Sequence, residues 1–398
     1  MSLSSTRGGS CATQKRVSVL TDVDFWHCRG GDRSRIGSLL LALSRHVRLT
    51  LLWPTTLDDS ALQALSLHWP DVQIHALNLP QHGSAGLARQ AVRSFFEDRP
   101  QDVCIFEFLS LGWLRSAVPA GVLTLIDTHD VASQRDADLA KLNALSNRAP
   151  MTPKREAAQL QTFDGVIAIN QLDALVFADW VGAQRVMVVP HLQALRPRRL
   201  RPVASRLLFV GGFYGPNLAG LTWLLREVWP RLANRDLTLD VVGDVGPALG
   251  FAAGPHRTGG QTPSKGTARA MSPGHDWVAG VHFHGHVADL EAVYDAADIV
   301  VNPVRHGSGL KIKSVEALAR GLPLVSTIHG ARGLVDGDAA TDPAFWVADT
   351  AEAFTSAVVA LVADLARRER MGQAALRLAQ RQFSEEACLA PLLGAIGG

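Results

Sequence analysis

The chain has 398 residues, of which 47% are hydrophobic and 19% charged, so it is long enough for two domains and too apolar for a disordered protein. Its 39 lysines and arginines nearly balance 37 aspartates and glutamates, and the net charge of +2 excludes a broad nucleic-acid-binding surface. Any anionic ligand must therefore be bound by a local group of residues. The four cysteines indicate neither a disulfide framework nor a zinc site, because none has C-x-x-C spacing: Cys11, Cys28, Cys104 and Cys388.

The chain has no apolar run that approaches the roughly 18 residues of a membrane-spanning helix. Residues 1–16 also lack the apolar core of a secretion signal. We therefore expect a cytoplasmic protein.

Short apolar and β-branched runs alternate with helical patterns through the first half of the chain. Residues 16–21 (RVSVLT) have strand character and lead through a polar loop into a helical pattern at residues 36–46. The unit recurs with strand-like runs at residues 47–53, 103–108, 122–127, 165–169 and 186–190. This alternation predicts an α/β fold with a parallel sheet covered on both faces, here a Rossmann-like domain over residues 16–190.

A break in the alternation follows at residues 191–206, where two prolines and five arginines indicate an interdomain linker. The pattern of strands and helices then restarts and predicts a second Rossmann-like domain over residues 207–375. We expect the last segment, residues 376–398, to form a helix that packs back across the domain junction. The stretch between Gly246 and Val281 is rich in Gly, Pro, Ser and Thr, which predicts a mobile insertion.

Two doubly wound domains that face each other leave a cleft at the carboxyl ends of both sets of strands, where open α/β sheets bind ligands. The most informative loop lies within residues 306–323, where a glycine-bearing segment enters a helix that stops at Gly321. The free backbone N–H groups and the dipole at a helix start favour an anion.

Lysine is scarce in this chain, with six lysines among the 39 basic residues, yet Lys311 and Lys313 both stand at this helix start. Their position indicates a phosphate site that uses compact ammonium groups, with a solvated helix face as the alternative. Glu316 follows Lys313 on the same side of the helix. Its carboxylate could accept hydrogen bonds from a ribose or pair with either lysine.

At this point the sequence resembles a known family. The run of residues 307–327, preceded by residues 297–303, resembles the donor-binding signature of GT-B glycosyltransferases of the large retaining group 1 (family 4) class. Further segments match in the same order over nearly the whole chain: residues 127–130, 163–169, 209–212 with Pro216, Asn217 and Trp223, then 281–287, 294–298, 370–372 and 383–384. The resemblance implies two Rossmann-like domains that face each other across a cleft, with the acceptor bound by the N-terminal domain (residues 16–190) and the nucleotide-sugar donor held by the C-terminal domain (residues 207–375).

The resemblance also implies a hexosyltransferase-type reaction that moves a sugar from a nucleoside diphosphate sugar to an acceptor hydroxyl, with retention of anomeric configuration. The donor is a substrate, and the family implies neither a metal nor another cofactor, because basic side chains and helix starts neutralise the departing diphosphate. In the family, the glutamate that matches Glu316 binds the ribose hydroxyls. The proposed same-face mechanism assigns no side chain as the acceptor base, since the leaving phosphate oxygen takes the proton.

Two positions depart from the family pattern. Ser308 stands where many members have an acidic residue that contacts the donor sugar. The Arg and Lys that commonly follow the first strand of the second domain are also absent, because residues 211–217 contain no base. The diphosphate charge would then fall on Lys311, Lys313 and Arg305.

First-domain loops contribute further candidates. Gly30 and Gly31 follow the first strand and let the backbone approach a phosphate, and the adjacent residues 32–35 could place an arginine in the cleft. His129 stands where the family has a histidine near the 6-position of the donor sugar. We expect Asp130 either to orient His129 or to cap the helix that begins at Val131.

His282, His284 and His286 alternate along one predicted strand, which suggests a metal site. We favour instead a base-binding strand end at His286 and Val287, because the same strand has no Cys or acidic partner. The predicted catalytic residues are thus His129, Asp130 and Lys313. The predicted donor-binding residues are Gly30, Gly31, Gly211, Gly212, His286, Val287, Ser308, Gly309, Leu310, Lys311, Lys313 and Glu316.

The acceptor cannot be named from the sequence, because it would contact variable first-domain loops. A glycan, a lipid-linked oligosaccharide or a protein fits a role in surface glycan or glycoconjugate biosynthesis, and nucleic acid does not. The arginines at 196, 198, 199 and 201 could contact anionic lipid at the inner membrane surface. The alternatives are a nucleotide-sugar epimerase or hydrolase on the same fold, and a non-catalytic nucleotide-sugar-binding subunit, the latter suggested by Ser308 and the missing basic pair.

Overall fold

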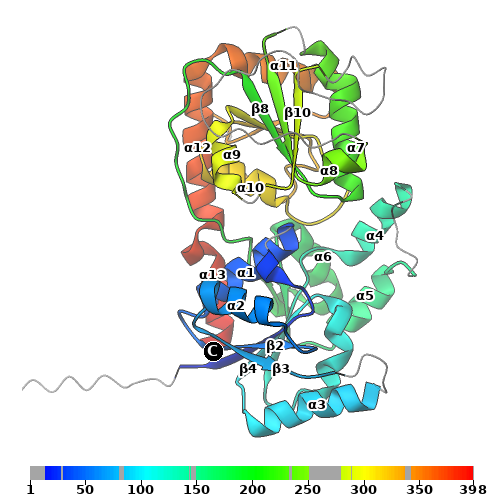
Figure 1. The fold of residues 1–398 in the computed structure, drawn as a ribbon. Coiled ribbons are helices and arrows are strands. Elements are labelled where there is room, and N and C mark those ends of the chain that lie inside the picture. The colour runs from blue at the N-terminus through cyan, green and yellow to red at the C-terminus, as the bar shows by residue number, and fades with distance from the viewer. Residues whose placement is uncertain are drawn as a thin grey trace, which may run out of the picture.

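The computed structural model describes residues 14–27, 30–79, 85–142, 144, 149–232, 235–250, 279–287, 289–336 and 342–397. Most of the expected insertion, together with Cys11 and Cys28, lies outside these residues. Two α/β domains stack end to end, each built around its own parallel sheet (Figure 1). The expected fold class is therefore confirmed.

The first domain contains a seven-stranded parallel sheet in the order β3-β2-β1-β4-β5-β6-β7. Its strands are β1 (Arg16–Leu20), β2 (Arg48–Trp53), β3 (Val72–Ala76), β4 (Val103–Glu107), β5 (Leu123–Asp127), β6 (Gly165–Ala168) and β7 (Val186–Val188). The central strands are buried along their whole length, which is why they read as continuous apolar runs in the sequence.

Helices cover both faces of this sheet (Figure 1). They are α1 (Gly31–Leu43), α2 (Asp59–His68), α3 (Ala85–Asp98), α4 (Ala132–Lys141), α5 (Pro153–Leu160) and α6 (Gln171–Val181), with 3₁₀ segments at Phe25–His27, Leu109–Ala117 and Ala183–Arg185. Three of them start at side chains that accept a hydrogen bond from the first turn, namely Asp58, Thr152 and Asn170.

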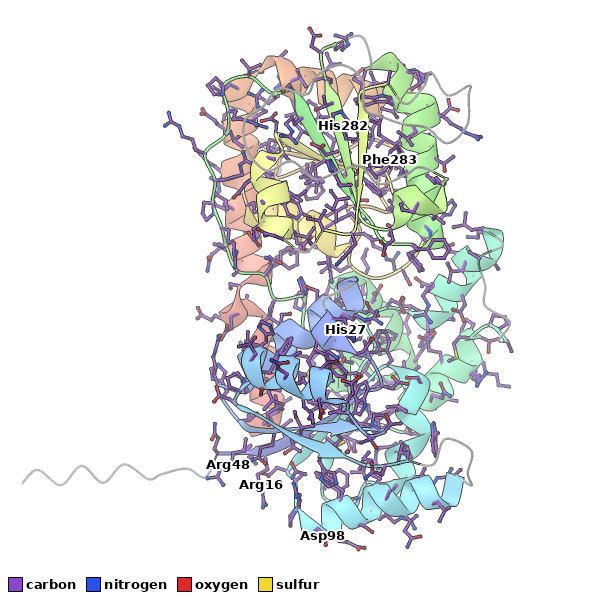
Figure 2. All side chains as sticks on the ribbon, viewed as in Figure 1. Arg16, His27, Arg48, Asp98, His282 and Phe283 are labelled. Carbon is purple, nitrogen blue, oxygen red and sulfur yellow. The ribbon has the colours of Figure 1, made fainter. Side chains whose placement is uncertain are left out.

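The second domain contains a six-stranded parallel sheet in the order β10-β9-β8-β11-β12-β13. Its strands are β8 (Arg206–Val210), β9 (Thr238–Val242), β10 (Val281–Gly285), β11 (Ile299–Asn302), β12 (Leu324–Ser326) and β13 (Trp346–Val347). Figure 2 shows His282 and Phe283 on β10, and His27 in the first domain. The helices are α7 (Gly215–Trp223), α8 (Val245–Ala248), α9 (Leu290–Ala296), α10 (Ile312–Ala319), α11 (Ala351–Ala363), α12 (Leu365–Phe383) and α13 (Glu385–Gly397). A π turn at Leu224–Val228 and a 3₁₀ turn at Trp229–Arg231 continue α7.

The C-terminal helices connect the two domains. The expected boundary at residue 376 lies inside α12, which continues unbroken to Phe383 because its apolar face packs on α10. The chain turns at Ser384, and α13 then packs against α1 and β7 of the first domain. Cys388, Leu392 and Ile396 belong to the same apolar core as the first strand, so the end of the chain completes the first domain.

The segment between β7 and β8 is extended and bound to the second domain. Arg196 and Arg198 donate backbone hydrogen bonds to the carbonyls of Ala319 and Arg320. The side chain of Arg201 pairs with Asp298 at 2.7 Å, and that of Arg196 pairs with Glu291 at 3.0 Å. Arg196, Arg198 and Arg201 therefore hold this segment against the second domain. Among the described residues, no helix has the length and apolar composition needed to cross a bilayer.

Candidate donor-binding site at the domain junction

The carboxyl ends of the strands of both sheets meet where the two domains touch (Figure 1). A Cβ placed on Gly31, the first residue of α1, would lie 3.0 Å from Cδ1 of Ile312, the first residue of α10. The N-termini of these two helices therefore come together across the junction. Since both helix starts favour negative charge, their convergence creates a local anion site in a chain with almost no net charge.

The glycine loop before α10 is bound to the first domain. The backbone N–H of Gly307 donates to Asp138 at 2.8 Å, and the hydroxyl of Ser308 donates to the carbonyl of Val131 at 3.2 Å. Gly309 has a φ of +71°, and a Cβ there would lie 3.0 Å from the carbonyl oxygen of His129. Glycine is required at this position by both the left-handed conformation and the close approach of the domains.

Lys311 and Lys313 are partly buried beside this loop. The Lys311 ammonium donates to the carbonyl of Ser308 at 2.6 Å, and burial lowers its pKa to about 8. The Lys313 ammonium donates to Oδ1 of Asn217 at 2.8 Å and lies 4.4 Å from the ring centre of Phe209. Burial, and then repulsion from Lys311, lower its pKa to about 7. Neither lysine has a carboxylate at ion-pair distance within the described residues, so both are available to an anion.

Glu316 lies one turn into α10. Its Oε2 accepts a 2.6 Å hydrogen bond from the hydroxyl of Tyr294, the buried aromatic residue of α9. Burial raises the pKa of Glu316, while the Tyr294 hydrogen bond and Arg320 oppose that rise. This partner fixes one oxygen of the carboxylate and leaves the other available to a ligand. The sequence left open whether Glu316 pairs with a lysine, and the structure gives it Tyr294 instead.

The other predicted donor-site residues of the second domain lie at neighbouring strand ends. The N–H of Gly211 donates to the carbonyl of Val242 at 2.8 Å, which closes the end of β8 onto β9, and Gly212 next to it is exposed. His286 and Val287 follow the end of β10. Leu310 is buried among apolar residues of the second domain and anchors the glycine loop rather than presenting its side chain.

In the first domain, Gly30 precedes α1 with a φ of +108°. The helix carries Arg35 inward, where it forms two hydrogen bonds of 3.0 Å to Asp127 and one of 2.8 Å to the carbonyl of Val189. Residues 32–35 were expected to place an arginine in the cleft. Of the arginines in this segment, Arg35 is instead buried beneath the cleft. Its position holds the start of α1 against the carboxyl end of β5.

His129 is buried and has a φ of +60°. Its Nε2 lies 2.6 Å from Oε2 of Glu107, and the Phe108 ring stacks on the imidazole at 3.8 Å between ring centres. Glu107, and not Asp130, therefore orients His129. Burial, followed by repulsion from Asp127, raises the pKa of the Glu107 carboxyl.

Asp130 also does not cap α4, contrary to the second expectation for it. Its carboxylate pairs with Arg135 at 2.8 Å. The first amides of α4, those of Ala132 and Ser133, instead donate to the two oxygens of Glu156 at 2.7 Å each. Glu156 belongs to α5, and it reaches the start of α4 because the two helices pack together.

Glu107, Asp127 and His129 offer ligand atoms that lie within 4.8 Å of one another and are all buried. The fit for a metal is poor, because the guanidinium of Arg35 already occupies both oxygens of Asp127. The alternating histidines of β10 contact a carboxylate of the neighbouring strand. His284 lies 2.7 Å and His282 3.5 Å from the buried Asp240 of β9, which also accepts from Arg206.

Residues 204–364 match the family model described as glycosyl transferases group 1. A curated relative from Klebsiella pneumoniae is named as an uncharacterized 44.6 kDa protein in the cps region. It is 28% identical over 130 residues, which are 32% of this chain and 30% of the relative. The match with this relative thus spans less than a third of its length.

Solved structures match over nearly the whole chain. Anabaena Alr3699/HepE, solved in complex with UDP and glucose, has a TM-score of 0.66 at 14% identity, covering 96% of this chain and 100% of that one. The lipopolysaccharide outer core galactosyltransferase WaaB has a TM-score of 0.59 at 12% identity, covering 96% and 98%. At these identities the likeness shows the fold. Residues 204–364 therefore match the group 1 glycosyltransferase family, and the whole chain has the two-domain GT-B fold of these solved structures.

Proposed function

We propose that the protein transfers a sugar from a nucleoside diphosphate sugar to an acceptor hydroxyl, with retention of configuration and without a metal. The observation that carries the proposal is the pair of partly buried lysines at the start of α10, with Glu316 one turn further on the same helix. Their ammonium groups would neutralise the diphosphate as the sugar leaves, and the helix start would supply N–H donors. Glu316 would bind the ribose diol through the oxygen that Tyr294 does not occupy.

The first domain would then supply the sugar end of the site. The backbone carbonyl of His129 faces the position of Gly309, and Glu107 fixes the imidazole ring beneath the junction. We assign His129 to the donor sugar and Lys313 to the leaving diphosphate. Asp130 would act through Arg135 and through its electrostatic support of the charged Lys311.

UDP is the diphosphate to test first, because Alr3699/HepE has been solved with it. The surface-glycan context is supported by the names of two similar proteins, which refer to a cps region and to a lipopolysaccharide outer core galactosyltransferase. A cytoplasmic protein acting at the inner membrane surface on a lipid-linked or polymeric glycan fits this context.

The test is a panel of UDP-, GDP-, ADP- and TDP-sugars incubated with the protein and with carbohydrate acceptors, in the presence of a metal chelator. Released diphosphate and the anomeric proton signal of the product are followed by NMR. We expect one diphosphate to be released in step with a product of unchanged anomeric configuration. Diphosphate release without acceptor product would favour the hydrolase alternative. Tight diphosphate binding with no turnover from any donor would favour the non-catalytic subunit.

A further inference from the structure

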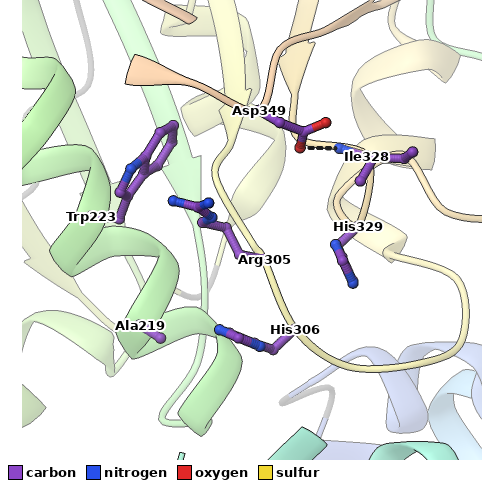
Figure 3. Close-up of a pocket in the computed structure, with 7 residues that line it drawn as sticks. All are labelled: Ala219, Trp223, Arg305, His306, Ile328, His329 and Asp349. Carbon is purple, nitrogen blue, oxygen red and sulfur yellow. Dashed lines mark hydrogen bonds between the residues drawn. The ribbon is translucent and has the colours of Figure 1, made fainter.

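A cavity of about 480 Å³ opens at the carboxyl edge of the second sheet (Figure 3). Its walls come from α7, from the loop between β11 and α10, and from the segments after β12 and β13. Its size is within the range of small-molecule sites. The donor-site residues described above do not line it.

Three basic side chains line this cavity: Arg305, His306 and His329. The guanidinium of Arg305 stacks on the ring of Trp223 at 4.9 Å, and the two imidazole rings lie 6.4 Å apart. Among the described residues, none of the three forms a side-chain hydrogen bond or ion pair with the protein. Their donors are therefore free for a ligand.

The one carboxylate in the cavity wall, Asp349, is already engaged. Its Oδ1 accepts a 2.9 Å hydrogen bond from the backbone N–H of Ile328. Burial lowers the pKa of His329, and Lys311, His306 and Arg332 lower it further, whereas Asp138 in the first domain opposes this shift. Arg332 is paired with Asp173 at 3.0 Å, whereas Arg305 has no carboxylate at ion-pair distance among the described residues, and this guanidinium favours an anionic occupant.

The cavity is separate from the predicted diphosphate site. Asn217, the partner of Lys313, and Ala219 on the cavity wall are two residues apart on α7. Two residues correspond to about 200° of helix rotation, so their side chains project from nearly opposite faces. The sequence left Arg305 as a third candidate for the diphosphate, and its stacking on Trp223 places it on the cavity side of α7 instead.

We infer that this cavity binds a phosphate group, which adds a second anion subsite to the proposed glycosyl transfer and rests on that proposal. Three donor groups from two segments, the loop before α10 and the segment after β12, suit a tetrahedral phosphate, which offers an oxygen to each, better than a planar carboxylate. Stacking on Trp223 pre-organises the guanidinium, so little side-chain freedom is lost on binding.

The test uses the full chain labelled with ¹⁵N-histidine, saturated with UDP so that the donor site is filled. Inorganic phosphate and methyl phosphate are titrated in separate arms, and acetate serves as the carboxylate comparison. The imidazole signals of His306 and His329 are assigned with His306→Gln and His329→Gln. We expect phosphate to shift both signals and to raise the pKa of His329, because a bound anion stabilises the imidazolium ion.

Arg305→Met should weaken phosphate binding about tenfold, since a charge-assisted hydrogen bond is lost. The matched control is Arg226→Met, because Arg226 is an exposed arginine on the turn that continues α7. Equal phosphate binding by wild type and Arg305→Met, or acetate binding as tight as phosphate binding, would overturn the inference. UDP binding is measured separately by thermal unfolding of the same samples, so a failure of the donor proposal is seen independently.

Discussion

The imidazole of His129 and the carboxylate of Glu107 lie 2.6 Å apart at the carboxyl ends of two adjacent strands, both buried beneath the domain junction. One oxygen of Glu107 holds the histidine, and the other has no hydrogen-bond partner among the described atoms. The hydrogen bonding of the Glu107 carboxylate is therefore directed at His129. Its geometry makes Glu107 a positioning residue for the ring that we assign to the donor sugar.

Glu107→Gln should therefore lower kcat for sugar transfer about tenfold while leaving the Kd for UDP unchanged, because the residue acts through His129 and not on the diphosphate. The pH profile of kcat should also move, since an amide does not stabilise an imidazolium ion as a carboxylate does. The control is Glu97→Gln on the exposed side of α3. A change in UDP affinity equal to the change in kcat would show that Glu107 has only a structural role.

Binding of UDP should take up protons near neutral pH. In the free protein, burial lowers the pKa of Lys313 to about 7 and that of Lys311 to about 8. A bound diphosphate favours the charged lysines and raises both pKa values, so affinity should fall as the pH rises from about 7 to 9. Calorimetry in buffers of different ionisation enthalpy measures the uptake. An affinity for UDP that is constant over this range would contradict the assignment.

The pairing of Glu316 with a ribose can be tested with altered nucleotides. Wild-type protein should bind 2′-deoxy-UDP more weakly than UDP, by about tenfold for a lost hydrogen bond to a charged group. Glu316→Gln should lose most of that discrimination. Tyr294→Phe removes the hydroxyl that orients Glu316 at 2.6 Å and should reduce discrimination in part. If both variants keep the full preference for UDP, another residue binds the ribose.

The contact at Gly309 should control how closely the domains approach. An alanine there would have an unfavourable φ of +71° and a Cβ 3.0 Å from the His129 carbonyl. We expect Gly309→Ala to cost about 1 kcal/mol or more and to enlarge the radius of gyration measured by X-ray scattering. The matched control is Gly121→Ala, where φ is also positive at +93° but a Cβ would meet no atom within 4 Å. Identical scattering and activity for both variants would rule out this role.

Asp240 should stabilise the fold in a pH-dependent way. Despite burial, hydrogen bonds from His282 and His284 and the charge of Arg206 hold its pKa well below the ordinary value of 3.8. A carboxyl with a depressed folded-state pKa stabilises the protein above its unfolded-state pKa, and this contribution is lost as the pH falls toward the folded-state pKa. Asp240→Asn should therefore cost about 3 kcal/mol at pH 7 and less below pH 4. Urea denaturation at both pH values measures the difference, and an equal cost at both would refute the linkage.

The sequence predicts the two sheets well because their central strands are continuous apolar runs, as in β4 and β11. The sequence does not predict the edge strand β3. One of its five residues is buried, and two of them, Gln73 and His75, are polar, so the apolar pattern is weak. The sequence places the start of the last helix too early, since nothing in the spacing marks the turn at Ser384.

Some residues of the candidate site could likewise be predicted from the sequence, and others could not. Lys311, Lys313 and Glu316 could be predicted because they share one helix start, where spacing alone fixes their geometry. Glu107, Asn217 and the role of Tyr294 could not, because each meets its partner through the packing of separate elements. The apolar strand that ends in Glu107 was a usable signal, since a carboxylate at a buried strand end faces the cleft.

The central claim is that Lys313 and Glu316 form the donor site. It is tested most directly by thermal unfolding of wild type, Lys313→Ala, Glu316→Ala and the exposed control Lys154→Ala against UDP, GDP, ADP and TDP. A diphosphate at a hundred times its Kd should stabilise wild type and the control by about 2.7 kcal/mol and neither site variant. If none of the four diphosphates shifts the wild-type midpoint, or if both site variants shift as wild type does, the donor site lies elsewhere.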